Sequence, residues 1–172
     1  MKFNKSFYPF AIFILIFLTS CNNNESYLQE YKNYKELHTI KNQRLTCWFP
    51  VKLIKSDAKK IKNISYLSTK CVFGVFNYSN GELYNLIFAD EAIIDSIHFE
   101  IFLSQIEKVK KNIPEWFLEV DYWTAKQREI ILFDNCYIYR DTENKQIYYF
   151  HPDEESTFIN GKIYPGIRNT IR

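Results

Sequence analysis

Apolar and polar residues alternate along three stretches in the first half of the chain. The stretches are residues 44–55, residues 66–79 and the positions Tyr84, Leu86 and Phe88, which follow Asn80-Gly81. Such alternation is typical of strands that bury one face, and Asn-Gly is a strong signal for a two-residue hairpin turn. The pattern predicts a three-stranded antiparallel meander whose strands share one apolar face.

The register of this meander follows from pairing its apolar positions. A turn at Asn80-Gly81 places Val75 opposite Leu86, and the matching register of the first two strands places Cys47 opposite Cys71. Pro50 has no N–H to donate to a ladder, so we expect the first strand to lie at a sheet edge or to carry a bulge.

Helical spacing of apolar residues follows the meander. From about residue 91 to residue 112 they recur every three or four positions, and Pro114 ends the pattern. We expect this central helix to cover the apolar face of the sheet. A tyrosine stripe with the same spacing predicts another helix over residues 26–39.

Alternation returns in the last third of the chain. Residues 116–123 alternate weakly, residues 130–140 and 146–150 predict a hairpin around 142–145, and a last small hairpin turns at Asn160-Gly161. The sequence therefore predicts an α+β fold with a mainly antiparallel sheet, in which the meander and the C-terminal hairpins pack against one central helix.

The first 21 residues have the layout of an export signal. Lys2 and Lys5 precede an apolar run over residues 7–18, and the small residue Ser20 precedes Cys21. The run is well short of the roughly 20 apolar residues that a transmembrane helix needs. A permanent membrane span is therefore not expected here.

The ending Leu18-Thr19-Ser20-Cys21 resembles the lipobox of bacterial lipoproteins. The resemblance implies a signal peptide over residues 1–20 and a diacylated Cys21 as the first mature residue. Residues 21–25 would form the lipidated cysteine and a polar tether, and residues 26–172 one domain. In enteric lipoproteins an aspartate after the cysteine favours the inner membrane. Asn22 at this position favours the outer membrane.

Charge and composition narrow the function classes. The chain has 22 basic and 20 acidic residues, and loss of Lys2 and Lys5 with the signal leaves equal numbers. A mature chain with no net positive charge lacks the excess of basic residues that is typical of nucleic-acid-binding proteins. With 31 aromatic residues among 172 and only four glycines, the chain is expected to fold around an aromatic-rich core.

Cysteines and histidines offer little catalytic chemistry. Cys47 and Cys71 are candidates for a disulfide in an oxidising compartment, the alternative being two reduced, buried cysteines. Cys136 has no base beside it in the sequence. The histidines lack the spacing of a metal site. We predict no catalytic residues, no metal and no cofactor.

The favoured hypothesis is a lipid-anchored, non-enzymatic protein that binds another protein at the membrane, as an envelope assembly component or an immunity-type protein. The candidate binding patch is aromatic: Trp48, Trp116, Tyr122 and Trp123. A lysine group, Lys55, Lys59, Lys60 and Lys62, is expected in a solvated loop between the first two strands. The alternatives are a small-molecule or glycan-binding lipoprotein and an envelope enzyme.

Overall fold

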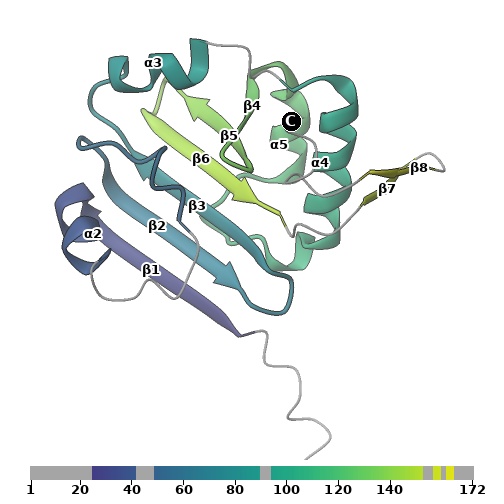
Figure 1. Cartoon of the computed structure of the whole chain (residues 1–172), viewed down its shortest axis with the longest axis horizontal. Helices are drawn as coiled ribbons and strands as arrows, with labels where there is room; N and C mark the ends of the chain where they lie inside the picture. The colour runs from purple at the N-terminus through teal and green to yellow at the C-terminus, as the bar shows by residue number, and fades with distance from the viewer. Residues whose placement is uncertain (1–24, 42–48, 90–93, 153–156, 160–161, 165–172) are drawn as a thin grey trace, which may run out of the picture.

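The computed structural model describes residues 25–41, 49–89, 94–152, 157–159 and 162–164. The fold is α+β, with a six-stranded antiparallel sheet and helices on both of its faces (Figure 1). The predicted fold class is thereby confirmed. None of the described helices has the length and apolar character needed to cross a bilayer.

The strand order in the sheet is β1-β2-β3-β6-β5-β4. The strands are β1 (Ser26–Asn33), β2 (Lys59–Tyr66), β3 (Cys71–Asn77), β4 (Ile130–Phe133), β5 (Cys136–Asp141) and β6 (Gln146–His151). A separate hairpin pairs β7 (Thr157–Ile159) with β8 (Lys162–Tyr164), as predicted. The helical elements are α2 (Tyr34–Lys41), α3 (Glu82–Ala89), α4 (Ser96–Lys108), η1 (Lys110–Asn112), α5 (Val120–Ala125) and η2 (Gln127–Glu129).

Two apolar clusters cover the two faces of the sheet. Alternation along the strands sends Phe76 and Ile138 into the cluster shared with α2, α3 and residues 49–58. It sends Phe73 and Tyr137 into the opposite cluster, shared with α4 and α5. The central strands are therefore buried on both sides, which explains the nearly continuous apolar sequence of β3 and β6.

The predicted central helix is confirmed as α4. It begins where the Asp95 carboxylate accepts a hydrogen bond of 2.8 Å from the His98 N–H. Phe102 and Ile106, one turn apart, are fully buried against the sheet.

Two predicted elements in the N-terminal half are wrong. Residues 26–33 form an edge strand and not the start of a helix, which begins only at Tyr34. The predicted strand over residues 44–55 is absent from its described part, where residues 51–53 form a turn. The neighbours of β3 are β2 and β6, so the predicted pairing of that strand with residues 66–79 does not occur.

The predicted hairpin at Asn80-Gly81 is also wrong, because residues 82–89 form α3. The Asn80 side chain accepts a hydrogen bond of 3.0 Å from the Glu82 N–H, as a helix cap does. The predicted strand would have buried Leu86 on its apolar face. In the helix Leu86 is 81% exposed, whereas Tyr84 is fully buried.

Two further differences lie in the C-terminal half. The weak strand predicted over residues 116–123 is wrong, since its second half belongs to α5. The stretch 130–140 is two strands, β4 and β5, joined at Asp134 and Asn135, which both have positive φ. Such a pair of left-handed residues makes a tight hairpin turn. The predicted turn at 142–145 is confirmed between β5 and β6.

Candidate functional site

The predicted aromatic patch is only partly at the surface. Trp123 is fully buried, with its ring centre 5.2 Å from that of Phe102 and 5.7 Å from that of Phe117. Placing Trp123 on a surface was wrong, because α5 turns this side chain into the core. Trp116 is half-buried beside Phe117, and Trp48 lies outside the described residues.

Tyr122 is the most exposed described member of the patch, at 39%. Its hydroxyl oxygen lies 3.1 Å from that of Tyr139, and Lys126 Nζ lies 5.8 Å from the Tyr139 ring centre. Burial raises the pKa of Tyr139, and its hydrogen bond with Tyr122 raises it further. The Tyr139 phenol is therefore neutral at physiological pH, and at Tyr139 this surface offers an aromatic contact and not an activated base.

The two described cysteines, Cys71 and Cys136, are buried in the core and are not exposed nucleophiles. Cys136 is fully buried, and burial raises the pKa of its thiol well above the usual value. Cys71 is buried opposite Tyr66, with its sulfur 3.0 Å from Thr69 Oγ1. The register that suggested a Cys47–Cys71 bridge is thus wrong. The bridge itself stays a prediction, because Cys47 and the lipidation residue Cys21 lie outside the described residues.

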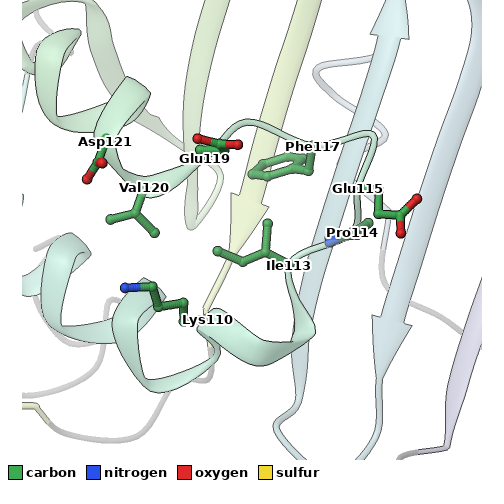
Figure 2. Close-up of a pocket in the computed structure, with 8 residues that line it drawn as sticks. All are labelled: Lys110, Ile113, Pro114, Glu115, Phe117, Glu119, Val120 and Asp121. Atoms are coloured by element: carbon green, nitrogen blue, oxygen red, sulfur yellow. The ribbon is translucent and has the colours of Figure 1, made fainter.

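A hollow of about 350 Å³ opens between η1 and the start of α5 (Figure 2). Its apolar lining is Ile113, Pro114, Phe117 and Val120, and its charged lining is Lys110, Glu115, Glu119 and Asp121. In Figure 2 Glu119 and Asp121 lie on the α5 side and Lys110 on the opposite side. Carboxylates beside an apolar wall suit a lysine or arginine side chain of a partner, whose stem is apolar and whose head is cationic.

No metal centre is present in the part of the chain that the structure describes, where no group of three or more His, Cys, Asp or Glu side chains is arranged to hold an ion. His98 Nδ1 lies 2.8 Å from Asp95 Oδ1 at the exposed start of α4. The His98 N–H and then its side chain hold the pKa of Asp95 below the usual value. This pair caps the start of a helix.

The predicted lysine loop is mostly a strand. Lys59, Lys60 and Lys62 lie in β2, and Lys62 forms an ion pair of 2.9 Å with Glu30 of β1. Lys60 and Lys62, with Lys32 and Glu36, line a second hollow of about 390 Å³ beside the C-terminal end of β1. The lysines therefore lie on β2, next to the edge strand β1, where their charge opposes aggregation through the sheet edge.

The outer edge of β1 is the feature that the sequence pattern missed. Its inner edge pairs with β2 in an unbroken register, and the Leu67 N–H donates to the Glu25 carbonyl over 3.0 Å. In an antiparallel ladder the residues that bond the neighbouring strand alternate with those whose N–H and C=O point away from it. Because Glu25 bonds the neighbouring strand, so do the odd-numbered residues that follow it in β1. The N–H and C=O groups of the even-numbered residues Ser26, Leu28, Glu30 and Lys32 therefore point outward.

One of these outward groups is already satisfied. The Lys32 N–H donates a hydrogen bond of 2.6 Å to a carboxylate oxygen of Glu36 in α2. The Glu36 N–H in turn donates to Asn33 Oδ1 over 3.0 Å, which caps the start of this helix. The backbone groups of Ser26, Leu28 and Glu30 have no such partner among the described residues. Glu36 therefore closes the edge at one end and leaves a short open stretch of ladder.

The opposite edge of the sheet, formed by β4, is short and partly covered. β4 has only four residues, and its Ile130 carbonyl accepts a hydrogen bond of 3.2 Å from the Ile94 N–H. Short, covered edges are the usual protection against unwanted strand pairing. β1 has eight residues, and Tyr27 and Leu28 are 45% and 54% exposed on its two faces.

The comparisons add no relative to these observations. Models of known protein families, curated proteins and solved structures yield no match to this chain.

Proposed function

We propose that this chain is a lipid-anchored protein of the bacterial envelope, tethered through Cys21, that binds an extended segment of another protein along the open edge of β1. The open stretch of ladder at Ser26, Leu28 and Glu30 is the observation that carries the proposal. Strand addition to such an edge gives affinity through main-chain hydrogen bonds and specificity through side chains on both faces.

The side chains along β1 indicate what the partner segment looks like. Tyr27 and Leu28 are neighbours on opposite faces and are both exposed, so the added strand is expected to place one apolar side chain on each face near them. Glu30 is already paired with Lys62. The partner therefore gains little by carrying a charge beside Glu30.

The export signal supports the same conclusion from the sequence side. Cys21 precedes β1 by five residues, so an anchored chain would hold this edge beside the membrane, where envelope proteins meet. Anchoring also raises the local concentration of the edge relative to a membrane-bound partner.

The test is site-specific photo-crosslinking in the native cells. A photoreactive amino acid replaces Tyr27 in the full-length chain, and a second version carries it at Lys145, in the turn between β5 and β6. We expect one discrete adduct with another protein from position 27 and none from position 145. An adduct between two copies of this chain, or none at either position, would overturn the proposal.

Two variants at one position identify the backbone as the binding element. Leu28→Pro removes an outward N–H without removing a bond to β2, which an edge strand tolerates, whereas Leu28→Thr changes the side chain and keeps the N–H. We expect the adduct at position 27 to be lost with Leu28→Pro and kept with Leu28→Thr. Thermal unfolding of both variants serves as the control for folding.

A further inference from the structure

We infer that the end of the sheet where β1 begins rests on an anionic bilayer surface, through Leu67, Lys70 and the lysines of η1. This inference rests on the proposed lipid anchor at Cys21. It adds an orientation to the anchored protein and a second contact with the membrane besides the acyl chains.

The first step is the length of the tether. Four Cα–Cα steps lead from Cys21 to Glu25, so the two Cα atoms lie at most about 14 Å apart. Glu25 is fixed to the sheet by its hydrogen bond of 3.0 Å from the Leu67 N–H. The polar headgroup layer of a bilayer is about 5–7 Å thick on each side. Leu67 is therefore held within reach of the lipid surface.

The second step is what surrounds Glu25. In Figure 1 the start of β1 and the turn between β2 and β3 lie at the same end of the sheet. Asn112 Nδ2 donates to Thr69 Oγ1 over 3.4 Å, which places η1 beside this turn. The start of β1, the β2–β3 turn and the C-terminal end of α4 thus lie at one end of the molecule.

The third step is the chemistry of this end. Leu67 is 48% exposed, and the exposed lysines around it are Lys70, Lys108, Lys110 and Lys111. The nearby acids are Glu25, Glu107 and Glu115, and Glu107 pairs with Lys110 over 3.2 Å. Glu119 and Asp121 face Lys110 across the hollow of Figure 2, so Lys70, Lys108 and Lys111 are the lysines of this end outside that hollow. An exposed leucine close to exposed lysines matches a bilayer surface, where the leucine enters the interface and the ammonium groups meet lipid phosphates.

This orientation has a consequence for the β1 edge. The eight residue-to-residue steps from Glu25 to Asn33 rise about 27 Å along the strand. In an antiparallel pairing of two copies centred on Gln29, the Glu25 of the second copy faces Asn33 of the first. Its tether of at most about 14 Å cannot return to the same bilayer. Upright on a membrane, the edge is thus open to another protein and closed to a second copy paired in this register.

Amine labelling of the lipidated full-length protein tests the inference. The protein is reconstituted into vesicles of phosphatidylcholine with phosphatidylglycerol, into phosphatidylcholine vesicles, and into detergent micelles. Acetylation of each lysine is then followed by mass spectrometry. Lys35 and Lys145, exposed at the opposite end of the sheet, are the matched controls.

Lys70, Lys110 and Lys111 are expected to react about fivefold more slowly in the anionic vesicles than in micelles, since each lysine at an anionic surface gains on the order of 1 kcal/mol. Lys35 and Lys145 should react equally in both. Added salt should weaken the protection. Equal rates at both ends on anionic vesicles would overturn the inference.

The same samples separate this inference from the proposed function. Sedimentation of the vesicles reports whether the chain is anchored at all, and an unanchored chain would overturn the anchor and the inference together. A chain that sediments and shows no lysine protection would overturn the orientation alone. Leu28→Pro should leave the lysine protection unchanged, because the β1 edge and the lipid contact use different groups.

Discussion

At the scale of single residues, Gly74 makes room for Tyr149 on the neighbouring strand. The two residues are direct partners in the β3–β6 ladder, and a Cβ added to Gly74 would overlap the Tyr149 ring. That ring is fixed, because the buried Tyr149 hydroxyl donates to Asn63 Oδ1 over 2.8 Å.

Gly74→Ala is therefore expected to lower the free energy of unfolding by about 1–3 kcal/mol, as overpacking of a core does. Gly81→Ala is the matched control, because its new Cβ would meet the end of the flexible Arg140 side chain. Urea unfolding of both variants measures the difference. An equal loss for the two variants would contradict this account of Gly74.

The sequence could indicate residue types at this scale but not their surroundings. Burial of Cys136 agrees with the expectation of an unreactive thiol. The burial of Trp123 could not be predicted, because its element was taken for a strand and helix α5 turns the ring inward. Local spacing does not determine exposure when the element type is uncertain.

At the scale of elements, long helices and simple hairpins were predictable and mixed patterns were not. α4, the β5–β6 hairpin and the β7–β8 hairpin agree with the sequence pattern. In β1 the tyrosines recur at helical spacing, yet pairing with β2 decides the conformation. In α3 the positions Tyr84, Leu86 and Phe88 suit a strand, but the Asn80 cap starts a helix.

The helix α3 has a direct test. Tyr84 is fully buried and its hydroxyl donates to Asp57 over 2.8 Å, so Tyr84→Ala should cost about 3–5 kcal/mol of unfolding free energy. Leu86→Lys should change that free energy by less than about 0.5 kcal/mol, because the side chain faces solvent. Chemical unfolding checks both, and a large loss for Leu86→Lys would favour the strand.

At the scale of the whole molecule, buried and half-buried tyrosines make the stability of the fold depend on alkaline pH. Burial is the largest cause of the raised pKa of six of them: Tyr66, Tyr84, Tyr137, Tyr139, Tyr148 and Tyr149. A group whose pKa is higher in the folded than in the unfolded chain stabilises the fold below its unfolded pKa. That contribution is lost as the pH rises through the folded pKa.

Stability is therefore expected to fall as the pH rises above about 10, the pKa of an unperturbed tyrosine. These six phenols should ionise together with unfolding and not before it. Parallel titrations of tyrosinate absorbance and of circular dichroism check this. Ionisation of these six tyrosines in the native chain near the unperturbed pKa would contradict the burial of their rings.

The binding edge of β1 could not be predicted from the sequence, because it depends on the arrangement of the whole sheet. The open edge of β1 depends on which strands become neighbours and on Glu36 closing one end, and both are long-range features of the fold. The signal peptide and lipobox are predicted from a local pattern, the order of residue types over residues 1–21. The anchor is therefore a prediction of the sequence, and the binding edge is an inference from the fold.

Amide hydrogen exchange along β1, resolved by residue, tests the central claim most directly. In the chain alone we expect the Leu28 and Glu30 amides to exchange rapidly and the Gln29 and Tyr31 amides, which bond β2, to be protected. With the crosslinked partner bound, Leu28 and Glu30 should become protected as well. Protection of Leu28 and Glu30 in the chain alone, or no change with the partner, would contradict an open edge that binds by strand addition.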